Sequence, residues 1–412
     1  MKRVAVLAPE PIRPRMAGMG IRALELARAL STEFDVRLLV PNSAEEALRA
    51  AGGVPVASVA AGLAEAAGSV EAAVVSGHAA AAWYRELPAV PVATDLYDPF
   101  PIENLHYAAQ LGEEPARHDR ATLSLALARS DSILCASPDQ RLFYAGALYA
   151  AGRIGTRNFP ADPSLERLLA VVPFGVPEEP ASGDRARGRA AAGVPEEGTM
   201  LLFGGIYDWY EPDPLLAAWP LVRERVPDAC LLFLENPNPE TTPQRAWARA
   251  RERAQVLDPS GRVIVFSPWL PYEKRADLYA ASDLAVSVCR EGLETDLAFR
   301  TRLLDAAWGG VPSVSVGGGA LARELEEAGA GRRVGRDPRA LAETIAEMLR
   351  QADRAREAAR RFAAGRTWRR VSEPLLRWCR GASVDAGRLP LPEQDRNPLS
   401  RRSWGRRILG RA

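Results

Sequence analysis

Short apolar runs alternate with amphipathic, helix-like segments along most of this chain, and the alternation occurs twice. In the first half, residues 4–8 and 72–76 are such runs, and residues 21–30 have helical periodicity. In the second half, residues 200–203 and 284–289 are similar apolar runs. Runs of this length indicate buried parallel strands, and helices between them indicate βαβ units. The sequence therefore predicts an α/β protein with two doubly wound, Rossmann-like domains.

A polar segment, residues 177–197, lies between the two halves. It is rich in proline, glycine and charged residues and contains no long apolar run, which is typical of a connection between domains. We expect one domain over residues 1–180 and another over residues 181–365. Ligands bind at the carboxyl ends of strands in such domains. We therefore expect the two domains to face each other across a ligand cleft.

The composition is that of a globular protein without a general attraction to nucleic acid. Of 412 residues, 47% are hydrophobic and 25% are charged, and the formal net charge is +1. The four cysteines are far apart and lack metal-ligand spacing, so we expect buried free thiols in a reducing cytoplasm. The first residues are too short for a secretion signal, and no apolar run approaches the length of a spanning helix.

Polar residues are densest just after the run at residues 284–289. Three carboxylates lie in the loop, and a helix is expected between Thr295 as N-cap and Gly309 as C-cap. That helix carries two arginines and one aspartate, more than a core helix needs. A polar cluster at the carboxyl end of a strand is a candidate ligand site. Its members are Glu291, Glu294, Thr295, Asp296, Arg300, Arg302 and Asp305.

Residues 303–314, LLDAAWGGVPSV, resemble the LLEAMACGVPVV-type segment of family 4 glycosyltransferases. ETDLAFRTRLLD resembles a bacterial subgroup of that family. The resemblance implies the GT-B fold and a nucleotide-sugar donor whose ribose is bound by Asp305. In the family a glutamate near the sugar lies eight residues earlier, where this chain has Leu297. Glu291, Glu294 or Asp296 could take its place. Glu294, Thr295 and Asp296 are included among the expected donor-binding residues.

The same resemblance assigns roles to the domains. It implies that the first domain binds the acceptor and the second the donor. It also implies a helix within residues 366–380 that crosses back to the first domain, as the terminal helices of GT-B proteins do. The remaining residues, 381–412, are polar and basic and are expected to form a flexible tail.

Glycines follow the first strand of each domain. Gly18 and Gly20 precede the helix at residues 21–30, and Gly204 and Gly205 begin the sequence GGIYDWY, which resembles the same subgroup. Glycine allows the backbone to approach a diphosphate closely beside a helix N-terminus. The alternative is a tight turn without a ligand. Asp208 lies in this segment and is included among the expected donor-binding residues.

Two arginines are the candidate diphosphate ligands. Familiar members of the family supply an arginine and a lysine near the second glycine loop, and this chain has neither in that loop. Arg300 and Arg302 remain, because guanidinium groups match phosphate oxygens. The alternative for Arg302 is an ion pair with Asp305, which lies three residues along the same predicted helix.

Acidic residues also follow a predicted strand in the first domain. Asp95 and Asp98 lie in DLYDP, which resembles the same subgroup, and Glu103 follows. Carboxylates there could bind or activate an acceptor hydroxyl, so Asp95 and Asp98, with Arg300, are the candidate catalytic residues. Turn formation by Asp-Pro is the alternative. His78, at the end of another strand, could contact a substrate or be structural.

The resemblance implies hexosyl transfer to a hydroxyl acceptor with retention of anomeric configuration, in bacterial glycan or glycoconjugate synthesis. It implies neither a metal nor a cofactor besides the donor, and no aspartates two apart suggest a divalent cation. A sugar-nucleotide epimerase or phosphorylase and a non-catalytic nucleotide-sugar-binding protein are the alternatives. A dehydrogenase is disfavoured, because no G-x-G-x-x-G follows the first strand.

The end of the tail, SRRSWGRRILGRA, combines arginines with Trp404, Ile408 and Leu409. Basic and interfacial aromatic residues suit an anionic membrane surface. The expected location is therefore cytoplasmic, with peripheral contact at the inner face of the membrane as one alternative and a loosely ordered tail as the other.

Overall fold

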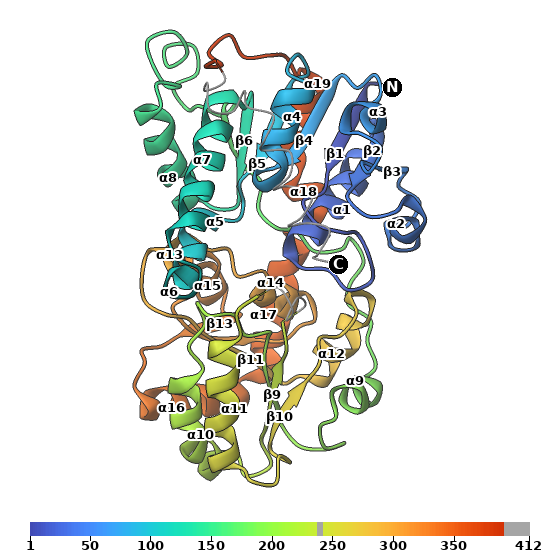
Figure 1. Ribbon diagram of the computed structural model, residues 1–412. Helices are drawn as coiled ribbons and strands as arrows, with labels where there is room; N and C mark the ends of the chain where they lie inside the picture. Colours follow the sequence, from blue (N-terminus) through green and yellow to red (C-terminus); the bar gives the residue numbers. More distant parts are fainter. Residues whose placement is uncertain (237–241, 391–412) are drawn as a thin grey trace. The chain divides into compact units, whose positions relative to one another are not determined.

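The computed structural model describes residues 1–236 and 242–390 and divides into two compact units (Figure 1). The first unit contains Met1–Phe174 and the chain from Trp368 onward, and the second contains Gly175–Thr367. The chain therefore passes between the units twice, after Phe174 and before Trp368. Each unit has one sheet of its own.

Seven parallel strands form the sheet of the first unit, in the order β3-β2-β1-β4-β5-β6-β7. The C-terminal helices α18 and α19, orange to red in Figure 1, belong to this unit. Its strands are β1 (Arg3–Leu7), β2 (Asp35–Val40), β3 (Val56–Ser58), β4 (Ala72–Ser76), β5 (Val92–Asp95), β6 (Ser132–Cys135) and β7 (Leu169–Val171). Its helices are α1 (Gly18–Leu30), α2 (Ala44–Ala51), α3 (Leu63–Ala67), α4 (Ala80–Glu86), α5 (Phe100–Glu103), α6 (Ala108–Leu111), α7 (Glu113–Arg129), α8 (Pro138–Ala150), α18 (Trp368–Val371) and α19 (Glu373–Arg380), with 3-10 turns at Gly77–Ala79 and Asn104–Tyr107.

Six parallel strands form the sheet of the second unit, in the order β10-β9-β8-β11-β12-β13. Its strands are β8 (Met200–Phe203), β9 (Cys230–Leu234), β10 (Ile264–Ser267), β11 (Leu284–Val288), β12 (Ser313–Val316) and β13 (Gly331–Arg333). Its helices are α9 (Arg185–Ala192), α10 (Asp213–Arg225), α11 (Arg245–Leu257), α12 (Arg275–Ala281), α13 (Leu293–Leu297), α14 (Thr301–Trp308), α15 (Gly319–Glu327), α16 (Pro338–Arg350) and α17 (Ala352–Ala364), with a 3-10 turn at Tyr272–Lys274.

Strands β8 and β9 of the second unit are buried on both faces. Leu201 and Phe203 of β8 belong to one apolar cluster, whereas Met200 and Leu202 belong to another. Successive side chains of a strand point to opposite faces, so the two clusters lie on opposite sides of the sheet. This explains why the strands are continuous apolar runs rather than alternating ones.

Both sheets share one topology. In each, the first strand lies inside the sheet, the next two follow on one side of it, and the remainder follow on the other side. This is the strand order of a Rossmann-like domain, and the order reverses between β1 and β4 and between β8 and β11. The predicted pair of doubly wound, Rossmann-like domains is confirmed. Ligands bind such domains at the carboxyl ends of the strands beside the reversal.

The helix predicted after the acidic loop is interrupted. The chain forms two helices, α13 and α14, with residues 298–300 between them. Thr295 lies inside α13 and not at an N-cap, so that prediction is wrong, whereas Gly309 does follow the last residue of α14. Arg300 folds back onto Glu294, with Nη2 2.6 Å from Oε2. Burial of this ion pair, whose members lie six residues apart, thus overrides helical propensity.

The glycines near the N-terminus are helical rather than part of a loop. Gly18 and Gly20 form the first turn of α1. The amide of Gly20 donates to the carboxylate of Glu10 at 2.6 Å. A Cβ atom at position 20 would lie 2.8 Å from the same oxygen. A side-chain carboxylate therefore already occupies the place where an external anion would meet this helix N-terminus.

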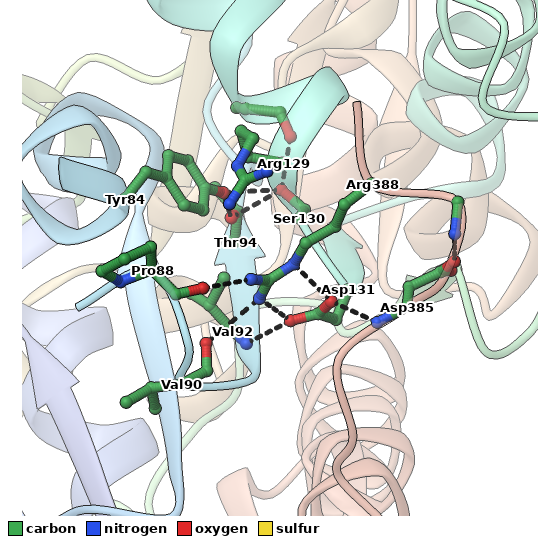
Figure 2. A network of polar contacts seen from close by, with 12 residues as sticks. Tyr84, Pro88, Val90, Val92, Thr94, Arg129, Ser130, Asp131, Asp385 and Arg388 are labelled. Carbon is green, nitrogen blue, oxygen red and sulfur yellow. Dashed lines mark hydrogen bonds and ion pairs between the residues drawn. The ribbon is translucent and has the colours of Figure 1, made fainter. Parts of the chain in front are cut away.

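A C-terminal strap, which we define as residues 382–390, lies against the amino ends of β5 and β6. Figure 2 shows Arg388 directed at Asp131 and at the carbonyl oxygens of Pro88 and Val90, with distances of 2.7 Å to Pro88 O and 3.1 Å to Val90 O. Asp131 also accepts from the amides of Val92, at 2.6 Å, and Asp385, at 2.7 Å. The first part of the expected tail is thus hydrogen-bonded to the first unit, and residues 391–412 lie outside the described residues.

Candidate functional site

The strand reversal of the second unit brings two loops together. The loop after β8 and the loop after β11 are joined by an antiparallel bridge between Tyr210 and Cys289. The amide of Arg290 donates to the carbonyl of Trp209 at 3.0 Å. Residues after β8 and residues before α13 therefore form one continuous backbone surface at the carboxyl edge of the sheet.

Gly204 and Gly205 lie directly beside Arg302 of α14. A Cβ atom at Gly204 would collide with Cδ of Arg302, and one at Gly205 would lie 2.8 Å from the carbonyl oxygen of Glu235. Arg302 donates from Nη1 to the carbonyl of Gly205 at 2.6 Å. The absence of side chains at both positions is what allows this close approach. The structure thus brings three of the expected donor-binding residues together.

The charge of Arg302 is held by aromatic rings. Its guanidinium carbon lies 5.1 Å from the ring centroid of Tyr207, 5.3 Å from Tyr210 and 5.8 Å from Trp269. These distances suit cation–π attraction. Among the described residues Arg302 forms no ion pair with a carboxylate, so the alternative pairing with Asp305 is not present. An uncompensated cation therefore lies at the glycine turn.

Asp305 pairs with Arg275 of α12. Arg275 Nε lies 3.7 Å from Asp305 Oδ1, and its guanidinium lies 3.6 Å from the ring of Tyr272 and 4.6 Å from the ring of Trp308. The two rings fix the orientation of the arginine beside the expected ribose ligand. The sequence analysis missed Arg275. The signal available was its position between two aromatic residues, Tyr272 and Tyr279, that follow β10.

The three acids of the loop differ sharply in environment. Glu291 is 82% exposed, and its nearest cation is Arg336 at 4.0 Å; Asp296 is also exposed. Glu294 is only 3% exposed. Its Oε1 has no hydrogen-bond partner among the described residues. A buried acceptor without a partner is costly unless a ligand or a water supplies a donor.

Arg300 is buried in an ion pair and is thereby distinguished from Arg302. It is 4% exposed, bonds to Glu294, and its Nε has no partner among the described residues. Burial lowers the pKa of Arg300, but the charges of Cys289 and Glu294 outweigh this effect and hold its pKa well above the usual value. Thr295 closes the group through a bond from its hydroxyl to the Arg290 carbonyl at 2.5 Å. Because the two side chains are paired, a ligand that contacts Arg300 would also lie beside Glu294.

Asp208 has a clear structural role. It accepts from the amide of Ala246 at 2.9 Å and from Nε of Arg245 at 3.2 Å. These groups lie at the N-terminus of α11, where amides lack partners within the helix. The carboxylate thus ties the β8 loop to α11, and any effect on a donor would be indirect.

Asp95 of the first unit is held by Arg22. Both carboxylate oxygens accept from the guanidinium, at 2.6 Å and 3.0 Å. The pair is buried, with side-chain exposures of 8% for Asp95 and 0% for Arg22. A small cavity lies beside the pair at the reversal between β1 and β4, and its lining includes Ser76, Asp95 and Tyr97.

Asp98 lies near the neighbouring strand end. Its Oδ2 is 4.0 Å from Nε2 of His78, whose ring centroid is 4.1 Å from that of Phe100. Burial, with a smaller effect from the charge of His118, lowers the pKa of His78 to about 4. The imidazole is therefore neutral at physiological pH and can accept a proton or a hydrogen bond.

Residues 1–236 and 242–390 contain no group of three or more histidine, cysteine, aspartate or glutamate side chains arranged to hold a metal ion. The described helices include none that is both long and apolar enough to cross a membrane.

Comparison with solved structures identifies the fold. The chain is similar to sucrose-phosphate synthase from Thermosynechococcus elongatus, with a TM-score of 0.63 and 15% identity over 92% of this chain and 99% of that one. It is also similar to Anabaena HepE in complex with UDP and glucose, with a TM-score of 0.65 and 16% identity over 92% of this chain and 100% of that one. WaaG, a glycosyltransferase involved in lipopolysaccharide biosynthesis, gives 0.59 and 14% identity over 93% and 99%. The chain has the GT-B fold.

No protein-family model matches the sequence, and no curated protein matches it either. The similarity thus rests on the fold, and it extends over nearly the full length of the compared proteins.

Proposed function

We propose that this protein is a glycosyltransferase that moves a hexosyl group from a nucleotide-diphosphate sugar to a hydroxyl acceptor in bacterial glycan or glycoconjugate synthesis. One observation carries the proposal: Arg302, without a carboxylate partner among the described residues, lies against the Gly204–Gly205 turn at the strand reversal of a GT-B fold. A cation beside backbone amides is suited to a diphosphate. HepE, which shares the fold, was crystallised with UDP-glucose.

The donor is assigned to the second unit. The amides of the glycine turn and Arg302 bind the diphosphate, and Asp305, oriented by Arg275, binds the ribose. Glu294 accepts a hydrogen bond from a hydroxyl of the sugar through Oε1, with Arg300 beside it. Transfer places negative charge on the departing diphosphate, and a preorganised cation stabilises that charge.

The acceptor is assigned to the first unit. Asp98 and the neutral His78 lie 4.0 Å apart at neighbouring strand ends and are suited to orient an acceptor hydroxyl. Asp95, which Arg22 engages through both oxygens, holds the loop that carries Asp98.

We further propose that transfer retains the anomeric configuration and needs neither a metal ion nor another cofactor. Proton NMR of the fresh product tests retention, because an inverted anomer would contradict it.

A thermal-shift titration with UDP, GDP, ADP and their glucose derivatives tests the donor site. A ligand that binds only the folded protein raises the melting temperature. At a ligand concentration a hundredfold above Kd, the free energy of unfolding rises by about 2.7 kcal/mol. The shift should disappear in Arg302→Met and Asp305→Asn. It should persist in Arg225→Met, a control arginine of α10 that pairs with Glu343 at 3.4 Å. Equal loss in all three variants would remove the support for this site.

The alternatives predict different products. An epimerase would convert the donor without any acceptor, whereas a transferase consumes it slowly until an acceptor is added. A non-catalytic binding protein would show the thermal shift but no turnover across a panel of sugar and lipid-linked acceptors.

Membrane contact through residues 391–412 stays a prediction, as does a cytoplasmic location, and the tail lies outside the described residues. Deleting residues 400–412 and measuring sedimentation with anionic liposomes tests it. Unchanged binding would exclude a role for the basic end of the chain.

A further inference from the structure

We infer that Arg22 is a positioning residue that holds the acceptor-side loop and the outgoing chain of the first unit as one piece; this inference rests on the proposed function. Arg22 lies in the first turns of α1 and is fully buried. Burial of an arginine is costly unless its donors are satisfied. Its donors are satisfied by two different segments of the chain.

The first segment is the loop after β5. Arg22 bonds to both carboxylate oxygens of Asp95, at 2.6 Å and 3.0 Å. Its guanidinium carbon also lies 4.7 Å from the ring centroid of Tyr97. Asp98, assigned above to the acceptor, follows in the same loop. The fork geometry of an arginine thus fixes both ends of the turn that precedes Asp98.

The second segment is the last stretch of the first unit before the chain crosses. Arg22 donates to the carbonyl oxygens of Val172, at 2.8 Å, and Pro173, at 2.9 Å. Phe174 ends the unit, and its ring lies 4.7 Å from that of Trp368, where the chain returns. The same Phe174 ring lies 5.9 Å from Tyr97. Both crossing points therefore pack against the group that Arg22 organises.

The arrangement makes the loop and the crossing segments mechanically dependent on one side chain. Glycosyl transfer needs an acceptor hydroxyl aligned with a donor that is bound by the other unit. A misplacement of about 1 Å can lower a rate by about 10²-fold. Lysine keeps the charge but is a point donor on a flexible stem and cannot serve four acceptors in a plane. Arg22→Lys should therefore impair alignment while leaving the donor residues untouched.

A matched control comes from Arg153 of the same unit. Its side chain is equally buried, and it bonds to the carbonyl oxygens of Leu127, at 2.6 Å, and Ser130, at 2.8 Å. Among the described residues, its side chain forms no hydrogen bond or ion pair with the loop after β5 or with residues 172–174. Arg22→Lys and Arg153→Lys should lower the melting temperature similarly. Only Arg22→Lys should lower kcat, by tenfold or more, with the donor Kd within twofold of the wild type.

Hydrogen exchange gives a readout that does not depend on activity. In Arg22→Lys the amides of residues 96–98 and those of Val172 and Phe174 should exchange faster together, whereas in Arg153→Lys they should keep their wild-type protection. Equal loss of kcat in both variants, or unchanged protection of the two segments in Arg22→Lys, would overturn the inference. If the wild type fails to bind any donor while the exchange result holds, the proposed function fails and the positioning role of Arg22 stands.

Discussion

At the scale of single residues, the site depends on side chains whose partners are incomplete. The Glu294–Arg300 pair uses one hydrogen bond of 2.6 Å, and Oε1 of the glutamate and Nε of the arginine have no partner among the described residues. A fully satisfied pair would need no ligand. This pair has one acceptor atom and one donor atom without partners. It can therefore bind a hydroxyl group, which both donates and accepts a hydrogen bond.

The pair leads to a prediction that separates stability from binding. Arg300→Met leaves a buried carboxylate alone and should lower the free energy of unfolding by about 3–5 kcal/mol. The double variant Glu294→Leu with Arg300→Met should recover most of that loss, because two apolar side chains replace two charges. Urea unfolding measures stability, and the donor-induced thermal shift measures binding. Recovery of the shift along with the stability would contradict a role for Glu294 in the site.

His78 should make stability depend on pH. Its pKa is lowered from 6.5 to about 4 in the folded protein, so between these values the unfolded chain binds more protons than the native one. The free energy of unfolding should therefore fall as pH is lowered from 6.5 toward 4. His78→Asn should flatten this part of the profile of melting temperature against pH. The same slope in both proteins would show that folding does not lower the pKa of His78.

At the scale of elements, close contacts at glycine decide how helices pack. Gly188 of α9 faces α12, and a Cβ atom there would overlap the carbonyl oxygen of Asp277. The same helices are tied by Arg187 and Asp277, with Nε 2.7 Å from Oδ2. The sequence signal for this contact was weak, because a glycine in a charged, alanine-rich segment also suits a linker.

Two glycine substitutions should therefore act in opposite directions. Gly188→Ala forces α9 away from α12 and should cost about 1–3 kcal/mol. Gly146→Ala lies in α8, where nothing is within 4 Å of the added atom. It should stabilise the protein by about 0.5–1 kcal/mol, because alanine favours a helix more than glycine. Denaturant midpoints measure both, and equal effects would contradict the packing assigned to α9.

At the scale of the whole molecule, the first unit is built from both ends of the chain. Its C-terminal part includes the strap at residues 382–390, where the Leu389 amide donates to Ala128 O and Arg129 donates to Leu389 O, both at 2.9 Å. The side chain of Asp131 is 1% exposed and forms an ion pair with Arg388 (Figure 2). The first unit is therefore complete only when residues 382–390 are present.

Truncation should show this dependence. A chain that ends at Gly381 loses the ion pair between Arg388 and Asp131. Removing one partner of a buried ion pair costs up to about 3–5 kcal/mol, and a loss of about 3 kcal/mol lowers a melting temperature by roughly 6–12 °C for a unit of this size. A chain that ends at Pro390 keeps every described contact of the strap and serves as the control. Calorimetry should show the unfolding transition of the first unit at a lower temperature only in the shorter chain. The donor-induced shift of the second unit should remain in both.

The sequence alone determined the elements that depend on neighbouring residues. Apolar runs marked β1, β4, β8 and β11, because strands buried on both faces tolerate few polar residues. Alternation of strands and helices predicted two doubly wound domains, and the position of Gly204 and Gly205 after a first strand placed part of the candidate site. These features are local, so periodicity and residue type suffice to find them.

Only the tertiary structure decided which charges meet. Arg22 finds Asp95 across 73 residues, and Arg388 finds Asp131 across 257. Asp305 pairs with Arg275 and not with Arg302, although the latter is its neighbour on the same helix. Many arginines were available for each carboxylate, and the sequence does not rank them. The choice depends on burial and on the crossing of distant segments, because a charge pair is fixed where desolvation leaves no other partner.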